Sequence, residues 1–391
     1  MMNWNRCLLA PCLLLILVMG NIRAADVTPR DFRLDPDLPY RAVPDNPVSY
    51  DVDFSVVITA PYHTKVLKVW LPLPPSDVAQ QITNRQLNTC PQNVTPEIAC
   101  EPLYGNQFAY FEFHDPQGGQ IIRHRFRAKV WQLRWNIDPA DVTAVTSWPT
   151  EFNAYLSPQS NLARDAEFRA TLNQIVPRPS GRAADLVSVM NWIDQNLSYD
   201  HASASLRADA QFAFRERRGH CSDYHGLCAT MGRSLGHPTR VTYGLHLLPK
   251  SSPSHCKMEA FLPPHGWVSF DLSETQKMVQ QIQRDEQLSA QAKDKLASAA
   301  RQRMLSGFRD NTWLLVTRGT DYRLVPPASQ TVPVVRTIYA EADGVPLPDP
   351  DPSNPEKREF SWMTVHQFKP DRRVSYPFTD LKSLERAVAA E

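Results

Sequence analysis

The sequence predicts an α+β protein in which an antiparallel β-sandwich-like module precedes a core of helices and strands. Three observations predict this class. Residues 47–135 alternate apolar and polar side chains with a period of two, as half-buried strands do. Residues 183–235 change to apolar spacings of three and four, typical of amphipathic helices. Residues 240–272 return to short strand-like runs, and helices followed by paired strands are typical of an α+β domain.

The composition is that of a folded protein and excludes several functional classes. The chain has 391 residues, of which 42 are basic and 41 acidic, so its net charge is +1. This balance argues against a nucleic-acid-binding protein, because phosphate recognition needs a concentrated positive field. Hydrophobic residues make up 42% of the chain, which excludes wholesale disorder. The 34 prolines against 14 glycines predict long loops and extended connections.

The first 24 residues have the pattern of a cleavable signal peptide. Arg6 precedes an apolar run from Leu8 to Gly20, which is too short to span a bilayer, since a span takes about 20 apolar residues. Cleavage after Ala24 fits the small residues there, and a retained anchor is the alternative. No later stretch has membrane-spanning length. We therefore expect a secreted or periplasmic protein without stable membrane insertion after signal removal.

The β module follows an extended leader, rich in proline and aspartate, at residues 25–46. Strands of the module are expected at residues 50–58, 66–73, 108–113 and 121–132. The last of these strands carries a row of basic side chains on one face. We interpret the row as a solvated strand face rather than as a docking strip for an anionic polymer. It consists of Arg123, Arg125, Arg127 and Lys129.

The core is expected over residues 183–345, after a connecting region at 136–182 without a clear period. Its predicted helices lie near residues 186–199 and 221–235, and its strands near 240–248, 255–262, 267–272, 313–317 and 332–340. Residues 276–306 lack Gly and Pro and predict a helical insertion, either a surface helix or a helical pair, with a lid over the site as a further interpretation. Residues 346–391 are interpreted as a tail rich in proline and charge.

The cysteines give a further indication of chemistry. Of the seven, Cys7 and Cys12 lie in the signal sequence, which leaves five. Cys90 and Cys100 bracket a short proline-containing loop and are the expected disulfide pair in an oxidising compartment. Three cysteines then remain, so at least one of them cannot be disulfide-bonded within this chain. An unpaired thiol in a secreted protein requires a chemical explanation.

The segment 217–275 contains a complete set of residues for acyl transfer. Cys221 opens a predicted helix after Gly219, where the free amide groups and the helix dipole lower a thiol pKa and stabilise an oxyanion. His255 begins one predicted strand and Asp271 ends the next. An imidazole there can pair with the thiolate and protonate a leaving amine, while the carboxylate orients the ring.

Each member of this set also has an ordinary structural interpretation. A cysteine at a helix start is often a small buried residue, and Asp271 could serve as a hairpin or capping residue. Proximity in the sequence does not single out His255 either, because four other histidines lie in the same segment. These are His220, His225, His246 and His265.

The shared context resembles the transglutaminase-like superfamily. The matching residues are Gly219-His220-Cys221-Ser222-Asp223, Leu235-Gly236-His237-Pro238-Thr239-Arg240, Tyr243-Gly244, His255-x-x-x-Glu259 and Gly266-Trp267-x-x-x-Asp271. This resemblance covers residues 185–275. It implies a papain-like α+β fold, a thioester intermediate, Cys221 as nucleophile, His255 as general base and acid, and Asp271 as the orienting carboxylate. The β module is similar to the usual companion of bacterial members.

The resemblance leaves the reaction open, because members include transamidases, proteases and amidases as well as proteins that have lost catalysis. We expect a protein or peptide substrate, with the cell envelope as its setting and peptide or glutamine-type amides as the target. No cofactor and no metal are expected, and the acidic run at 348–351 is interpreted as a linker rather than a calcium site. Lys257 stands where the family usually has an aromatic residue, which raises the question of how the acyl acceptor binds.

Two alternatives from other classes remain. Cys221, His225 and Cys228 stand at i, i+4 and i+7 of one helical face, with His255 and Cys256 as further ligands, so a structural zinc site is conceivable. The absence of paired Cys-x-x-Cys knuckles weighs against it. The second alternative is a non-catalytic scaffold or binding protein of the cell envelope, and an intact Cys, His and Asp set weighs against that.

Overall fold

The computed structural model describes residues 32–157, 161–200, 202, 205, 207–249, 254–348 and 361–389. The predicted signal peptide, residues 1–24, lies outside the described residues. Leu34–Glu391 form a single compact unit, so the β module and the core are not separate bodies. Among the described residues, no helix has both the length and the apolar character needed to cross a bilayer.

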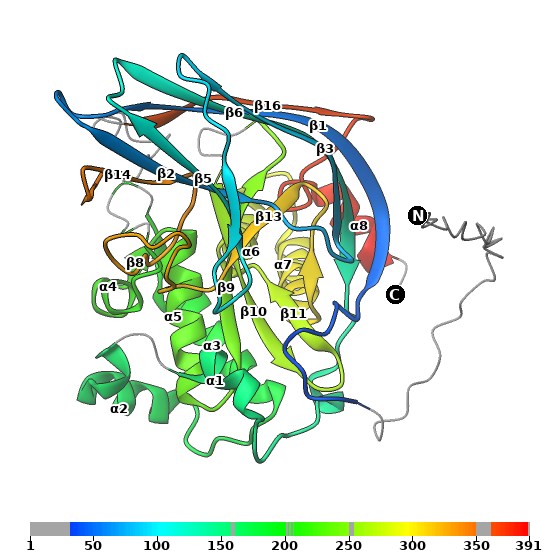
Figure 1. Ribbon diagram of the computed structural model, residues 1–391. Helices are drawn as coiled ribbons and strands as arrows, with labels where there is room; N and C mark the ends of the chain where they lie inside the picture. Colours follow the sequence, from blue (N-terminus) through cyan, green and yellow to red (C-terminus); the bar gives the residue numbers. More distant parts are fainter. Residues whose placement is uncertain are drawn as a thin grey trace, which may run out of the picture. The chain divides into compact units, whose positions relative to one another are not determined.

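Two five-stranded sheets build the β module, and all the pairings within them are antiparallel (Figure 1). The first has the order β12-β6-β1-β16 with β3 also paired to β6, and the second has the order β15-β14-β2-β5-β4. Six of the strands come from the expected module: β1 (Val43–Thr59), β2 (Val66–Leu73), β3 (Gln80–Cys90), β4 (Glu97–Cys100), β5 (Gln107–His114) and β6 (Gly119–Arg134). The other four come from later in the chain: β12 (Phe308–Arg309), β14 (Tyr339–Ala342), β15 (Val345–Pro346) and β16 (Ser361–Pro370).

The alternating pattern of β1 explains why the two sheets pack together. Phe54, Val56 and Ile58 are buried and join apolar side chains of β2 and β5 in one cluster. The same cluster takes in Leu245 and Val316 from the core sheet. Burial of this continuous apolar surface joins the β module to the core, since apolar contact is the main favourable term in folding.

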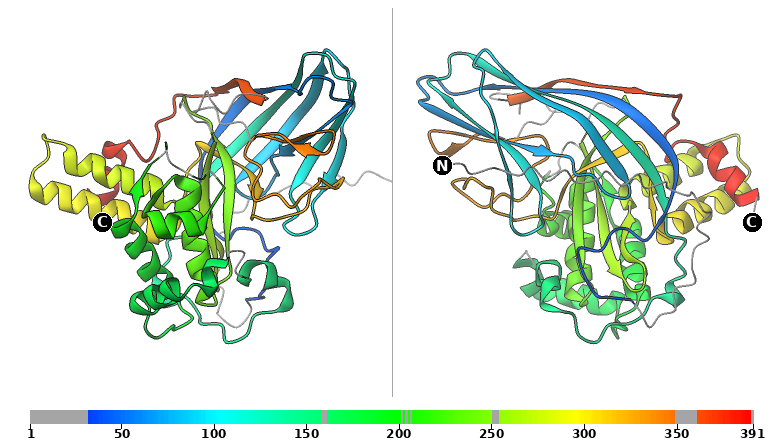
Figure 2. Two further views of the ribbon diagram at one scale, coloured as in Figure 1. Left: turned by 90° about the vertical axis from the view of Figure 1, so that its left-hand side faces the viewer. Right: turned by 45° about the vertical axis from the view of Figure 1, so that its right-hand side comes forward.

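The core sheet has the order β11-β10-β9-β13, and its strands are β9 (Thr239–His246), β10 (Ser254–Leu262), β11 (Gly266–Phe270) and β13 (Trp313–Arg318). Helix α5 (Cys221–Ser234) packs on β9 and β10, and α3 (Ala183–Asn196) and α4 (Ala210–Glu216) pack against α5. Figure 2 shows these helices on one side of the core strands. In α3 the predicted apolar face is buried: it consists of Leu186, Val189, Met190 and Ile193. The mixed helical and antiparallel architecture confirms the predicted α+β class.

The segment 276–306 belongs to a helical pair, one of the two arrangements expected for it. Helix α6 (Leu272–Arg284) begins earlier than predicted, and α7 (Ala290–Leu305) follows after a short turn. Their facing side chains form an apolar cluster with Leu384 of α8 (Leu381–Ala389). The connecting region also contains helices that were not expected, α1 (Asn153–Leu156) and α2 (Ala166–Ile175).

The segment interpreted as a tail contains two structured elements. Residues 361–370 form β16, which pairs along β1 from Tyr50 to Ile58, and residues 381–389 form α8. Pairing with β1 is a long-range event that composition does not report. The strand expected at 332–340 is likewise displaced: β14 begins at Tyr339 and pairs with β2 of the β module.

The predicted Cys90–Cys100 disulfide is absent, and both thiols are free and exposed. The sheet topology gives the reason. Cys90 ends β3, which pairs with β6 in the first sheet, whereas Cys100 ends β4, which pairs with β5 in the second. The loop between the two residues therefore crosses from one sheet to the other instead of closing on itself.

Candidate active site

Cys221 is the first residue of α5, as the sequence predicts. The preceding His220 has extended backbone geometry, and its N–H donates to Asp223 Oδ2 at 3.0 Å. Gly219 makes this turn possible, because a Cβ at that position would lie 2.6 Å from Asp223 Cβ. The Gly-x-Cys-x-Asp pattern thus has a local cause: the aspartate caps the helix, the glycine admits it, and the thiol is placed at the positive end of the helix dipole.

The surroundings of Cys221 favour its thiolate. Burial by itself raises the pKa of Cys221, but a hydrogen bond with Cys256 and the charges of His220 and His255 outweigh burial and hold that pKa well below its usual value. The Sγ of Cys221 lies 3.0 Å from His220 Nδ1. Burial and the neighbouring Cys221 raise the pKa of Cys256 well above its usual value, so Cys256 keeps its proton and donates it toward Cys221.

His255 lies near the start of β10, opposite Gly244 of β9. A Cβ on Gly244 would come within 2.6 Å of the Trp313 ring, so the glycine admits Trp313, whose Nε1 donates to the His255 carbonyl oxygen at 3.0 Å. The imidazole Nε2 lies 2.8 Å from Asp271 Oδ2. Burial lowers the pKa of His255, but the charges of Asp271 and Cys221 and hydrogen bonds to both raise it to about 9.

Asp271 makes two kinds of contact at once, since it bonds to His255 and caps a helix. It follows β11 and is the N-cap of α6, where its Oδ1 accepts from the Glu274 N–H at 3.1 Å. Burial alone raises the pKa of Asp271, but the charges of Lys257 and His255 hold it well below its usual value. The capping interpretation and the orienting role are therefore compatible, because they use different carboxylate oxygens.

Lys257 is the nearby cation that keeps the buried carboxylate of Asp271 ionised. It lies two residues after His255 on β10, and its Nζ is 2.5 Å from Asp271 Oδ2 and 3.0 Å from Asp310 Oδ2. All three side chains are at most 1% exposed. The unusual lysine is thus an internal cation beneath the site, so it cannot contact an acyl acceptor directly from this position.

The remaining motif residues hold the strands behind the site. Arg240 and Glu259 stand opposite each other on β9 and β10, with Nε and Oε2 2.7 Å apart. The Arg240 guanidinium also stacks on Trp267 of β11, 3.9 Å from the ring centroid. From the leader, Tyr40 donates its hydroxyl to Glu259 Oε1 at 2.6 Å. These contacts fix the spacing of β9, β10 and β11, and hence the approach of His255 to Asp271.

The residues considered as zinc ligands, Cys221, His225 and Cys228, make other contacts in the structure. His225 Nε2 accepts the Leu272 N–H at 3.0 Å and its Nδ1 lies 3.5 Å from Cys256 Sγ, so both ring nitrogens have protein partners. Cys228 is completely buried, and burial raises the pKa of its thiol, which disfavours the thiolate that zinc needs. Across the described part of the chain, Cys221, His225 and Cys228 do not form a ligand group.

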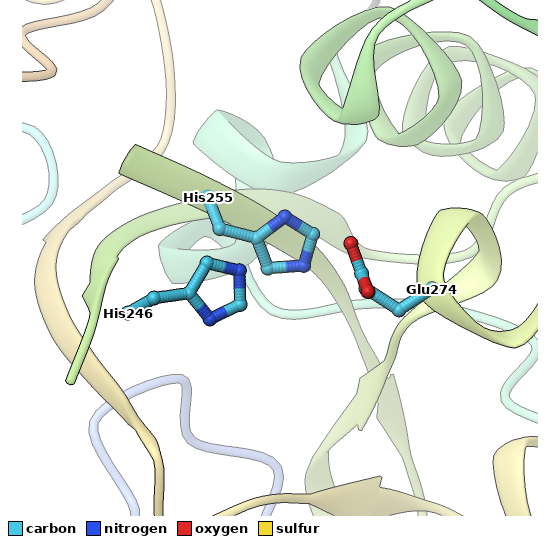
Figure 3. A group of neighbouring side chains, drawn as sticks. All are labelled: His246, His255 and Glu274. Atoms are coloured by element: carbon cyan, nitrogen blue, oxygen red, sulfur yellow. The ribbon is translucent and has the colours of Figure 1, made fainter. Parts of the chain in front are cut away.

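A different cluster brings potential metal ligands together. Within the described residues, one group has ligand atoms within 4.8 Å of one another, and it consists of His246, His255 and Glu274 (Figure 3). The two imidazole rings are stacked, with centroids 4.6 Å apart and planes inclined by 18°. Nitrogen lone pairs lie in the ring plane, so stacked rings do not direct theirs at one ion. His255 also forms hydrogen bonds with Asp271 and Cys221. The arrangement therefore favours a role for His255 in pairing with the thiol over a role as a metal ligand.

Several of these contacts were not anticipated from sequence. The sequence does not single out His220 from the other nearby histidines, and it offers Cys256 only as a zinc ligand. In the structure both residues contact Cys221. Tyr376, in the segment interpreted as a tail, packs its ring edge against His246 at 5.4 Å. Adjacency to Cys221 and His255 in the chain was the available signal for the first two, whereas nothing local indicated Tyr376.

The site is closed in this structure. Cys221 is 2% exposed, His255 is 4% exposed and Asp271 is 2% exposed. The structure thus brings together the three residues that the sequence selected: the imidazole bonds to the carboxylate, and the pKa of His255 and that of Cys221 are displaced in opposite directions. A low thiol pKa beside a raised imidazole pKa is the condition for a thiolate–imidazolium pair.

Comparisons with known proteins bear on the family and the fold. Residues 169–272 match the family model described as the transglutaminase-like superfamily. Comparison with curated proteins gives no match. A structure from Cytophaga hutchinsonii, described as a "Putative Cysteine Protease", is similar with a TM-score of 0.56 at 14% identity, covering 86% of this chain and 95% of that one.

A second similar structure is the periplasmic domain of TgpA from Pseudomonas aeruginosa, with a TM-score of 0.30 at 18% identity, covering 61% of this chain and 91% of that chain. The fold assignment depends on the Cytophaga hutchinsonii structure and on the family match. Residues 169–272 therefore form a transglutaminase-like core, and the chain has the mixed helical and antiparallel fold of a transglutaminase-like protein.

Proposed function

We propose that this protein is a cysteine-dependent acyl-transfer enzyme that acts on peptide or glutamine-type amides, with Cys221 as nucleophile. The observation that carries the proposal is the paired environment of Cys221 and His255: Asp271 bonds to the imidazole at 2.8 Å, the pKa of His255 rises to about 9, and that of Cys221 falls. Such a pair is charged at neutral pH without any activating cofactor.

The chemistry follows from which atoms are already engaged. His255 Nε2 is bonded to Asp271, so Nδ1 is the nitrogen left for Cys221 and the substrate. The Cys221 thiolate attacks the amide carbonyl carbon, and a C–S bond forms while the oxyanion develops. The backbone N–H of Cys221 at the helix start is a donor for that oxyanion. His255 then gives its proton to the leaving amine as the C–N bond breaks, which leaves a thioester.

The second half of the reaction reverses the proton movements. An incoming nucleophile gives a proton to His255 as it attacks the thioester carbonyl, and the thiolate leaves. Water as the nucleophile gives a protease or amidase, and a primary amine gives a transamidase. The apolar run near the N-terminus supports action outside the cytoplasm, on a protein or peptide of the cell envelope.

The test is the pH dependence of Cys221 alkylation by limiting iodoacetamide, followed site by site with peptide mapping. An ordinary thiol has a pKa of about 8.5 and reacts slowly at pH 6, whereas the paired thiolate reacts there already. We expect the alkylation rate of Cys221 to level off well below pH 8. The exposed Cys90 and Cys100 are internal references in the same sample.

Because Cys221 is buried, its alkylation rate depends on access of the reagent as well as on the pKa of the thiol. Matched variants separate these two effects. His255→Ala removes the cation and is expected to move the midpoint for Cys221 upward, whereas Cys228→Ala removes an equally buried thiol outside the site and leaves the midpoint unchanged. Cys221→Ala abolishes any amide hydrolysis or transamidation. An alkylation midpoint near 8.5 in the wild-type protein, unchanged in His255→Ala, contradicts the proposed nucleophile.

A further inference from the structure

A small cavity whose lining does not include Cys221 contains several arginines. It has a volume of about 120 Å³ and lies where the ends of β1 and β6, the short strand β12, helix α7 and the segment before α8 meet. Helices α7 and α8 pack against each other here (Figure 1). Four guanidinium-bearing side chains line the cavity: Arg134, Arg303, Arg372 and Arg373.

None of these four arginines forms an ion pair with a described carboxylate, although the charge of Asp45 acts on Arg134 and that of Asp310 acts on Arg303. Among the described residues, no carboxylate oxygen lies within salt-bridge distance of any of the four guanidinium groups. Their hydrogen bonds go to neutral groups instead: Arg303 donates to the Pro377 carbonyl oxygen at 3.0 Å, and Arg372 donates to the Pro47 carbonyl oxygen at 2.6 Å.

One carboxylate does line the cavity, but it accepts a hydrogen bond from a backbone N–H. Asp380 accepts the Ser383 N–H at 3.0 Å at the start of α8. The lining therefore holds four positive charges and one negative charge. The positive excess is local, because the chain as a whole has a net charge of only +1.

An aromatic ring holds two of these charges together. Arg134 and Arg303 both lie over the Phe308 ring, with guanidinium-to-centroid distances of 5.1 Å and 4.8 Å. Burial, reinforced by the charge of Arg134, lowers the pKa of Arg303 to about 10. Like charges held this close repel each other, and a bound anion between them would remove that cost.

We propose that this cavity is a binding site for a single phosphate group. Guanidinium forks match the oxygens of a phosphate, and several forks around one group are the usual protein solution for that anion. A cavity of about 120 Å³ has room for one such group.

This inference does not depend on the acyl-transfer proposal, because no residue of the Cys221, His255 and Asp271 set lines the cavity. Isothermal titration of the mature full-length protein with inorganic phosphate tests it directly, with sodium chloride adjusted to hold the ionic strength constant. We expect saturable binding of one phosphate per chain. Sulfate is expected to compete, because it has the same tetrahedral oxygens.

Two sets of variants make the test specific. Arg372→Ala with Arg373→Ala removes two exposed side chains and is expected to weaken phosphate binding at least tenfold without unfolding the protein. Arg125→Ala with Arg127→Ala, on the exposed face of β6, changes the net charge equally and is the control. Arg303→Lys keeps the charge but loses the fork, and we expect weaker binding with a normal unfolding transition.

Cosedimentation with lipid vesicles tests whether the bound phosphate belongs to a lipid headgroup or to a free ligand. Cosedimentation with phosphatidylglycerol vesicles but not with phosphatidylcholine, lost in the Arg372 and Arg373 double variant, indicates a lipid headgroup. Phosphate binding without cosedimentation indicates a free or small phosphorylated ligand. Absence of saturable phosphate binding overturns the proposal, and so does an equal loss of binding in the Arg125 and Arg127 control.

Discussion

Substitution of Lys257 measures how much this buried cation contributes to the free energy of unfolding. Its Nζ lies 2.5 Å from Asp271 and 3.0 Å from Asp310, and the side chains are 0 to 1% exposed. Lys257→Met keeps most of the apolar stem but removes the charge, which leaves Asp310 without a counter-ion at salt-bridge distance among the described residues. Removing one partner of a buried ion pair costs about 3–5 kcal/mol, and we expect a loss of that size in the free energy of unfolding at pH 7.5.

The pH dependence gives the sign of the effect. In the wild-type protein, burial raises the pKa of Asp310, but Lys257 and Thr312 outweigh it and lower that pKa. Its ionised form therefore adds stability above the unfolded pKa of about 3.9, and that stability is lost as the pH falls. In Lys257→Met the folded pKa of Asp310 rises instead. The destabilisation should thus be large at pH 7.5 and smaller at pH 5, where Asp310 takes up a proton.

Urea unfolding at the two pH values measures both differences. Lys65→Met is the matched control, because the Lys65–Asp115 pair has the same 3.0 Å separation but exposed side chains, and surface pairs contribute at most about 1 kcal/mol. Lys257→Met combined with Asp310→Asn removes both charges and should recover part of the loss. A cost of Lys257→Met below about 1 kcal/mol, or no recovery in the double variant, would refute the argument.

Two further predictions concern the candidate nucleophile. Asp271→Asn removes the charge that most raises the pKa of His255, so the high-pH limit of the pH–rate profile should move below about 9 and turnover should fall by about 10² to 10⁴-fold, as measured on a peptide amide; an unshifted limit would contradict the assignment. Cys256→Ala removes the hydrogen bond that most lowers the pKa of Cys221, so the midpoint for its alkylation should rise, while Cys228→Ala should not move it.

The burial of the site has a consequence for substrate entry. With Cys221 and His255 at 2% and 4% exposure, an amide cannot reach the thiolate without displacement of neighbouring side chains. Tyr376, from a segment that is far away in the sequence, packs on His246, whose ring stacks on that of His255. Burial also strengthens the ion pair, since charges in a water-poor site interact more strongly than in water.

The sequence anticipated the elements whose causes are local. The apolar periodicity of α3 and α5 predicted both helices, and alternation predicted β1, β2, β5 and β6. It missed β3, because Gln80–Cys90 is largely polar and is held mainly by pairing with β6. It also missed β16, because pairing with β1 joins positions about 300 residues apart, which no local pattern reports.

Sequence alone supplied Cys221, His255 and Asp271 as a set for acyl transfer, because local signals place them at a helix start and at strand ends and the surrounding motifs resemble the transglutaminase-like superfamily. Only the tertiary structure decided what surrounds them. Lys257 became the internal counter-ion of Asp271, Cys256 became a donor to Cys221, and four arginines met at one cavity, because these contacts depend on which side chains are brought together when distant strands and helices pack. Local patterns specify elements, whereas electrostatic environments are properties of the packed core.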